Sequence, residues 1–481
     1  MGKAPLSIGS QLLRTGSVYA FASLANRAAS FVLIPIYTRY LSPSEVGVVS
    51  LAEAVASVLL AIASLGLTSA LGLVYFRHAE HSDQQKASVG TTMRLALGST
   101  FGFGFLAIVF GPVFMDRFLP HYSVRFFPYI TLAVVSVFCA GNLDLPLVIA
   151  RSQKRAGLFA TLSLSHFGLS NVLVLLFVVA LSWGPVGMLS ARAAGAVVVS
   201  VVGLWTARRW LFSKGSGEAR RAALRIGAPL VPHQLIAFVL TEGNRFFLEH
   251  YRSVEEVGLY SLAHSVGAVM NVVGSTVMLA WSPVFFEKAR QGGESVKKLG
   301  ETGGTIIGGM IVIASIGVSV GPLAMKLLFD SRYASAAPAC AMVVTGFLFH
   351  GLFSVFHLSV MQHGKTEYLA LITAWAACVN LAANYFLVPR FGLFGSAWAT
   401  LLGYLVEFVV VVVVSMRLFP VPYPLRKIAF WLTSLGVVLI ISQWRPGQIP
   451  SIVAGITASV ALAAAVVLGT KRYLRSISSS G

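Results

Sequence analysis

The sequence predicts an all-α integral membrane protein built from two parallel helical lobes. Three observations predict it: the composition, the length of the apolar stretches and an internal repeat. Hydrophobic residues make up 56% of the 481 positions and charged residues only 11%, with a mean hydropathy of +0.80. Ordinary soluble domains are about 25% charged. The composition therefore indicates a chain that lies mostly in lipid.

Apolar stretches recur from one end of the chain to the other. A helix needs about 20 apolar residues to cross the hydrocarbon core, so each stretch predicts a membrane-spanning helix. Fourteen spans are predicted, at 14–38, 46–75, 88–113, 125–150, 156–181, 186–210, 225–249, 257–286, 303–328, 335–361, 367–388, 394–417, 426–443 and 450–470. The residues between them are too few for a soluble catalytic domain, which favours a protein that is not an enzyme.

Basic residues are distributed unevenly between the two sides of the membrane. With a cytoplasmic N-terminus, 24 of the 36 lysines and arginines fall on the cytoplasmic side and 8 on the other. The positive-inside rule therefore predicts that both termini are cytoplasmic. The net charge of +19 is spread through short loops rather than gathered on one soluble face, so we expect no nucleic-acid partner.

A thirteen-residue phrase occurs twice. YLSPSEVGVVSLA (Tyr40–Ala52) returns as YRSVEEVGLYSLA (Tyr251–Ala263), and each copy contains a serine and a glutamate placed to form a capping box at a helix start. Gly184–Gly187 and Gly392–Gly395 are a second pair of matching segments. Six predicted spans separate the copies, so both copies face the same side of the membrane. We therefore expect an N-lobe at 1–215, a C-lobe at 216–420 and two additional spans at 421–481, an arrangement typical of transporters.

Two segments resemble a known family. IPIYTRYLSPSEVGVVSLAEAVASVLLAIASLGLTSALGLVYFRH (Ile34–His78) resembles the opening of Wzx-type polysaccharide flippases, and GKTEYLALITAWAACVNLAANYFLVPRFGLFGSAWAT (Gly364–Thr400) resembles their later half. These flippases belong to the multidrug/oligosaccharidyl-lipid/polysaccharide (MOP) exporter superfamily. The resemblance implies a V-shaped pair of six-helix bundles, alternating access and a cargo of polyprenyl-pyrophosphate-linked sugars.

The resemblance implies a function. We expect a flippase that moves a lipid-linked oligosaccharide to the outer leaflet of a bacterial inner membrane for O-antigen or exopolysaccharide synthesis, as a monomer, with polysaccharide polymerase machinery as a partner. A peptidoglycan-precursor (lipid II) flippase and a cation-coupled multidrug antiporter are the alternatives within the superfamily. A membrane glycan polymerase or ligase is disfavoured, because such an enzyme is expected to carry a sizeable periplasmic loop.

Charged residues inside the spans are the candidate site, because burying a charge in lipid costs at least about 2.5 kcal/mol. Arg27 and Glu53 are expected about 18 Å and 12 Å below the outer surface at 1.5 Å per residue, where they can pair. The guanidinium of Arg27 suits a pyrophosphate. The remaining substrate-binding candidates are Arg192, Glu242, Arg245 and His264, of which His264 occupies the position equivalent to Glu53 in the second lobe.

Asp144 and Glu407 are candidate sites for a coupling proton or sodium ion, because each places a carboxylate inside a span. Asn380 and Asn384 lie one helical turn apart and predict interhelical hydrogen bonds. Lone histidines, including His350 and His357, are interpreted as structural. The sequence contains no HExxH, CxxC or nucleophile-elbow motif, so neither a cofactor nor a metal is expected.

Overall fold

Helices form nearly all of the structure. The computed structural model describes residues 32–79, 82–118, 122–444, 453–464 and 466, and this part of the chain contains no strand. Twelve of its helical segments are long and apolar enough to cross a membrane, and they match the second to thirteenth predicted spans in order. Most of the first predicted span, 14–38, lies outside the described residues. The last, 450–470, contains the shorter helix Val453–Ala464.

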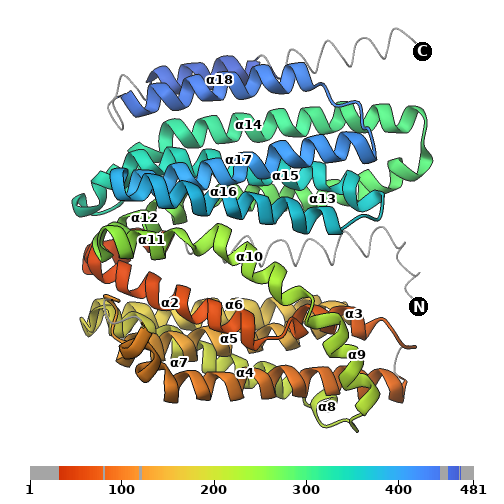
Figure 1. Cartoon of the computed structure of the whole chain (residues 1–481). Helices are drawn as coiled ribbons and strands as arrows, with labels where there is room; N and C mark the ends of the chain where they lie inside the picture. The colour runs from red at the N-terminus through yellow and green to blue at the C-terminus, as the bar shows by residue number, and fades with distance from the viewer. Residues whose placement is uncertain (1–31, 80–81, 119–121, 445–452, 465, 467–481) are drawn as a thin grey trace, which may run out of the picture. The chain divides into compact units, whose positions relative to one another are not determined.

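The chain divides into two compact units, Met1–Phe238 and Val239–Gly481. The predicted lobe boundaries at 215/216 and 420/421 stay a prediction. In the first unit (Figure 1) the long helices are α2 (Pro43–Ala63), α4 (Asp83–Phe118), α5 (Thr131–Ser152), α6 (Ala156–Val174) and α7 (Gly184–Thr206); the shorter ones are α3 (Leu67–Tyr75), η1 (Phe126–Ile130), η2 (Leu175–Ala180), α8 (Arg208–Leu211), α9 (Gly217–Gly227) and α10 (Leu230–Glu242), which crosses the division.

Helix α7 organises the part of the first unit that matters below. It packs against both α5 and α6, and α5 also packs against α2. The buried face of α7 carries small residues such as Gly187, Ala191 and Gly195. Small side chains let helix backbones approach closely in a membrane, where packing replaces the hydrophobic effect as the driving force. Four helices of one unit are thereby brought around a shared interior.

The second unit consists of α11 (Asn244–Tyr251), α12 (Val254–Gly267), α13 (Val269–Gln291), α14 (Glu294–Leu328), η3 (Ser331–Ala336), α15 (Ala337–Gln362), α16 (Glu367–Phe391), α17 (Leu393–Leu418) and α18 (Leu425–Trp444), followed by Val453–Ala464 (Figure 1). Helix α15 is buried along nearly its whole length. It packs against α12, α13, α14 and α17, and α17 packs in turn against α16. The α15–α17–α16 layer holds the polar groups of this unit.

Three predicted continuous spans are broken in the structure. The span predicted at 46–75 divides into α2 and α3, because Leu65 and Gly66 adopt positive φ angles of 49° and 65°. The span at 225–249 divides into α9, α10 and α11, and the span at 257–286 divides into α12 and α13 beside Ala268. Hydropathy does not register such breaks, because the residues that form them are themselves apolar or small.

The repeated phrase forms the same joint in both units. Ser42 and Glu45 make a complete capping box at the start of α2, and Glu45 also lies against Gly184, at the start of α7. In the second unit Glu256 lies against Gly392, just before α17. Both glycines have positive φ, 57° and 55°. The two repeated segments noted in the sequence therefore contact each other within each unit.

The second copy of the capping box differs from the prediction. Ser253 accepts a hydrogen bond from the Glu256 N–H, but the Glu256 carboxylate accepts from the Leu393 N–H at 2.7 Å. In the first unit the residue after the glycine is Pro185, which has no N–H to donate. The Glu45 carboxylate instead accepts from the Ser42 N–H at 2.7 Å.

Candidate functional site

The first unit contains an ion pair inside its spans. The Arg192 guanidinium, on α7, donates through Nη1 to Oε1 of Glu53, on α2. About a third of each side chain is exposed, 33% for Arg192 and 29% for Glu53. A pair of this kind is a functional candidate by default, because charges within spans are costly and usually face a cavity or one another.

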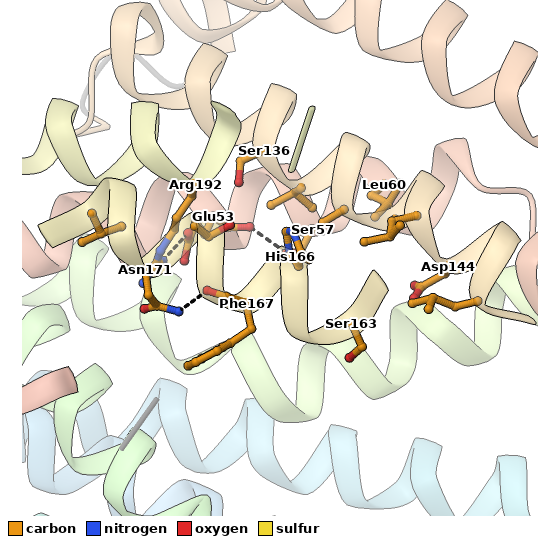
Figure 2. A pocket seen from close by; sticks show the side chains of 17 residues that line it. Glu53, Ser57, Leu60, Ser136, Asp144, Ser163, His166, Phe167, Asn171 and Arg192 are labelled. Atoms are coloured by element: carbon orange, nitrogen blue, oxygen red, sulfur yellow. Dashed lines mark hydrogen bonds and ion pairs between the residues drawn. The ribbon is translucent and has the colours of Figure 1, made fainter. Parts of the chain in front are cut away.

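Polar neighbours surround the ion pair. The Tyr37 hydroxyl donates to the Asn171 side-chain oxygen at 2.5 Å, and Asn171 Nδ2 donates to the Phe167 carbonyl at 2.7 Å. The Ser57 hydroxyl donates to the Glu53 carbonyl, also at 2.7 Å. Asn171 lies beside the Arg192–Glu53 pair (Figure 2). The pair is therefore embedded in neutral hydrogen-bonding groups rather than in hydrocarbon alone.

A pocket of about 690 Å³ is lined by the ion pair and by Ser57, Phe167 and Asn171. Its walls come from α2, α5, α6 and α7, all within the first unit. Besides Arg192 and Glu53, the polar lining residues are Ser57, Ser136, Asp144, Ser163, His166, Ser170 and Asn171. Hydroxyls, an amide and an imidazole spread over apolar walls are the surface expected for a polar ligand that is held by many hydrogen bonds.

Asp144 occupies the other end of this pocket. It lies on α5, away from Arg192 (Figure 2), and its side chain is exposed. No lysine, arginine or histidine of the described structure lies within ion-pair distance of it. The described lining therefore carries two carboxylates and one guanidinium, and the guanidinium is paired with Glu53.

Arg27 lies outside the described residues, so its predicted contact with Glu53 stays a prediction. The partner that the structure gives Glu53 is Arg192, a pairing that the sequence reasoning missed. Its signal was present: Arg192 is eight residues past Gly184, and Glu53 is eight residues past Glu45. Because Glu45 lies against Gly184, equal spacing from these two residues places both side chains at the same depth.

The other predicted substrate-binding residues belong to the second unit and do not line this pocket. Arg245 pairs with Glu242 one turn away and donates through Nε to the Ser261 hydroxyl at 3.1 Å. It is only 9% exposed, so it is buried rather than reaching for the membrane surface. The ring of His264 packs against Tyr260 and Phe347, with ring centroids 5.8 Å and 5.1 Å away.

Glu407, one of the two predicted coupling residues, lies in the middle of α17 and is 1% exposed. Its carboxylate contacts His350 on α15 and Thr373 on α16. The sequence analysis interpreted His350 as a structural, hydrogen-bonded histidine without naming its partner, and the structure places it beside the Glu407 carboxylate. Among the described residues, no group of three or more His, Cys, Asp or Glu side chains is placed to hold a metal ion.

Comparison with protein families identifies the chain's relatives. Residues 12–288 match the family model described as "Polysaccharide biosynthesis protein". The chain belongs to this family. A protein of the Lsg locus of Haemophilus influenzae is 20% identical over 291 residues, which span 58% of this chain and 67% of that protein. The succinoglycan biosynthesis transport protein ExoT of Rhizobium meliloti is 26% identical over 272 residues, 53% of this chain and half of that protein.

Solved structures of MOP-superfamily transporters share the fold. An inward-facing multidrug resistance MATE family transporter matches with a TM-score of 0.63 at 16% identity, covering 86% of this chain and 99% of that one. The lipid II flippase MurJ in an inward closed conformation matches with a TM-score of 0.60 at 12% identity, covering 95% and 99%. The chain is thus a multi-pass membrane protein of a polysaccharide biosynthesis family with the fold of MOP transporters and flippases.

Proposed function

We propose that this protein is a flippase that moves polyprenyl-pyrophosphate-linked oligosaccharide from the cytoplasmic to the outer leaflet of the inner membrane by alternating access. The observation that carries the proposal is the Arg192–Glu53 ion pair, which lines a polar pocket within the spans. Family membership supports the cargo class, since the relative from Rhizobium meliloti is named as a succinoglycan biosynthesis transport protein.

The ion pair supplies a way to bind and release an anion. A guanidinium forms two parallel hydrogen bonds to a phosphate oxygen pair, as it does to a carboxylate. A pyrophosphate that enters the pocket can therefore take the place of Glu53 on Arg192. Glu53 neutralises the guanidinium when the pocket is empty, so the unloaded protein avoids an unpaired buried charge.

The neutral lining suits the sugar part of the cargo. Ser136, Ser163, His166 and Asn171 extend from the ion pair along α5 and α6 toward Asp144. Sugar hydroxyls donate and accept hydrogen bonds, and these side chains can do both. Outward movement of the anionic pyrophosphate is assisted by an inside-negative potential, which contributes about 2.3 kcal/mol per charge per 100 mV.

A cationic drug is the second candidate cargo, and one observation favours it. Asp144 has no ion-pair partner in the described structure and lines the pocket with its carboxylate, a feature that suits a positively charged ligand. A lipid II flippase remains the alternative among lipid-linked cargoes. Each candidate can be offered to the same reconstituted protein, so the assay below distinguishes them.

Arg192→Ala tests the proposal. We expect it to reduce the transfer of a fluorescent polyprenyl-pyrophosphate oligosaccharide across proteoliposome membranes at least about tenfold. The reason is that the variant loses one charge-assisted contact, which contributes about 1.5–3 kcal/mol. Arg192→Lys should retain part of the activity, because lysine keeps the positive charge but cannot form the two parallel hydrogen bonds of a guanidinium. Arg208→Ala, which removes an exposed arginine on α8, is the matched control and should leave transfer unchanged.

Two outcomes contradict the proposal. Unimpaired transfer by Arg192→Ala would remove the ion pair from the mechanism. Transport of a lipophilic cation, with no transfer of the lipid-linked saccharide by the unmodified protein, would establish the drug antiporter instead. Preference for lipid II over other saccharide lipids would narrow the cargo to the peptidoglycan precursor.

A further inference from the structure

A carboxylate is buried at the middle of the second unit. Glu407 is fourteen residues from the start of α17 and eleven from its end, so it lies roughly 16–21 Å from either end at 1.5 Å per residue. It is 1% exposed. Among the described residues of this unit it is the one Asp or Glu in the central part of a membrane span. An unpaired charge at such a position is strongly unfavourable.

The partner of this carboxylate is itself titratable. His350 Nδ1 lies 2.8 Å from Glu407 Oε2, and the Thr373 hydroxyl donates to Oε1 at 3.3 Å. His350 is also central in its helix, thirteen residues past the first residue of α15. Its side chain is 32% exposed, against 2% for Glu407. The Glu407 carboxylate is thus enclosed, whereas about a third of the His350 side chain stays accessible.

In the described part of the chain, no lysine or arginine lies within ion-pair distance of Glu407. On α17, Tyr404 lies with its ring centroid 4.9 Å from that of His350. On α15, Phe353 stacks between His350 and His357, and His357 Nδ1 is bonded to the Ser354 carbonyl. On α12 the titratable groups facing this region are Tyr260 and His264.

The other helices packed against α15 and α17 add no central charge. Arg245, on α11, is held by Glu242 and Ser261. The charged residues of α13, α14, α16 and α18 lie in the first or last third of each helix: Glu287, Lys288 and Arg290 on α13, Glu294, Lys297, Lys298, Glu301 and Lys326 on α14, Glu367 and Arg390 on α16, and Arg426 and Lys427 on α18. Among the described residues, His350 is therefore the group placed to neutralise Glu407.

We infer that His350 and Glu407 form a proton-binding site through which a proton gradient is coupled to transport. The inference deepens the proposed function, on which it rests, by naming the coupling ion and the residues that hold it. His350 keeps part of its side chain exposed while Glu407 is enclosed, so the imidazole can take up or release a proton while the carboxylate stays buried.

The proton balance of the site is simple. With Nδ1–H donated to the carboxylate, Nε2 is the ring nitrogen free to take the proton. Binding converts neutral imidazole to imidazolium beside Glu407, so the pair changes from one net negative charge to none. The change removes an uncompensated charge from the membrane interior, and release of the proton restores it. The protonated and unprotonated pairs therefore differ in the free-energy cost of burying them away from water.

The donor set favours a proton over a sodium or divalent ion. Hard metal cations bind through several oxygens, six or more for calcium. At this site one carboxylate oxygen faces an imidazole nitrogen and the other faces a single hydroxyl. A metal ion would have to displace His350 to gain oxygen ligands.

Infrared difference spectroscopy of the purified full-length protein between about pH 8 and pH 5, the range in which histidine titrates, tests the site without any cargo. We expect a histidine protonation band, accompanied by a carboxylate perturbation, that disappears in His350→Asn. In Glu407→Gln the carboxylate perturbation should disappear and the histidine band should change, because the hydrogen-bond partner of His350 is gone. His357→Asn is the matched control: it removes a histidine two turns along the same helix, and the His350 band should remain.

Transport under an imposed proton gradient tests the coupling. In proteoliposomes carrying the fluorescent saccharide lipid, the unmodified protein should transfer cargo at least fivefold faster with the gradient than without it. Glu407→Gln and His350→Asn should lose this acceleration, while His357→Asn keeps it within twofold. Gradient-driven transfer that persists in Glu407→Gln would overturn the inference, as would an infrared difference spectrum that His350→Asn leaves unchanged.

These experiments distinguish a wrong cargo from a wrong proton site. If no saccharide lipid moves but the histidine band responds to both substitutions, the proposed cargo is wrong and the proton site is supported. If the lipid moves equally fast with and without a gradient, the cargo is supported and the coupling role is rejected.

Discussion

Asn384 illustrates how single polar residues hold the second unit together. Its side-chain amide donates to Asn244 Oδ1 at 2.5 Å, and it accepts from the Ser396 hydroxyl at 3.3 Å. Asn244 donates in turn to Tyr260 and Thr400. Both asparagines are fully buried. The network ties α11, α12, α16 and α17 together without placing any charge among them.

Asn384→Ala is expected to destabilise the protein by about 1–2 kcal/mol, because interhelical hydrogen bonds in membrane proteins average about 0.6 kcal/mol and buried partners are left unsatisfied. Thermal unfolding of the purified protein in micelles measures the change. Cys378→Ala alters an exposed residue on the same helix and serves as the control. Equal unfolding temperatures for the two variants would show that the network does not contribute.

At the residue scale the sequence singled out polar and charged side chains within the spans but did not assign the partners of the charged ones. Asn380 and Asn384 were expected to form interhelical hydrogen bonds, and this is confirmed for Asn384. Glu53 and Glu407 were singled out as charges within spans, but their partners Arg192 and His350 were not assigned to them. Partners depend on how helices rotate about their axes, and a hydropathy pattern contains little of that information.

The break between α2 and α3 is the clearest element-scale feature of the first unit. Gly66 has a φ of 65°, and a Cβ atom added there would lie 2.2 Å from the Gly227 carbonyl oxygen at the end of α9. A left-handed backbone and a close backbone approach both require glycine at this position. The break therefore lets α9 pack directly against the chain between α2 and α3.

Gly66→Ala is expected to lower the free energy of unfolding by more than about 1 kcal/mol, from the left-handed conformation alone, with the steric overlap adding to it. Gly102→Ala provides the contrast. Gly102 lies inside α4, and a Cβ there meets nothing within 4 Å, so alanine should be neutral or stabilise the helix by up to about 1 kcal/mol. If denaturant unfolding ranks the two variants in the opposite order, the account of the break is wrong.

At the element scale the twelve spans found in the described residues had all been predicted, because long apolar stretches are the strongest signal a sequence contains. The breaks within three of them were not predicted. Ala63–Ser64–Leu65–Gly66–Leu67 is apolar or small throughout, so no change in composition marks the break, whereas the close approach of Gly66 to Gly227 is visible only in the folded chain.

The distribution of charge determines how the whole molecule is expected to lie in the membrane. Arg155 falls in the basic loop between α5 and α6, whereas Ser182 falls in the loop before α7; both are exposed. The positive-inside rule places the first in the cytoplasm and the second outside.

Cysteine labelling tests this orientation. In a variant without Cys139, Cys340 and Cys378, we expect Ser182→Cys to react with a membrane-impermeant maleimide in intact cells. Arg155→Cys should react only after the membrane is permeabilised. The reverse pattern of labelling would invert the topology and place both termini outside.

For the whole molecule, composition and repeat were enough to predict an all-helical transporter fold, which the similarity to MOP-superfamily structures supports. The cargo stays a proposal. Apolar periodicity specifies where helices cross, while the pocket lining, which includes Asp144 and Asn171, is formed only when α5 and α6 are packed.

The glutamate–glycine contact occurs once in each half of the molecule, so its two copies can be compared by experiment. Glu45 rests on Gly184 in one half and Glu256 rests on Gly392 in the other, so an identical alteration can be introduced in either half and compared within a single polypeptide background. A difference between the two outcomes then reports the one local contrast already described: the Leu393 N–H donates to Glu256, whereas Pro185 has no N–H to donate to Glu45.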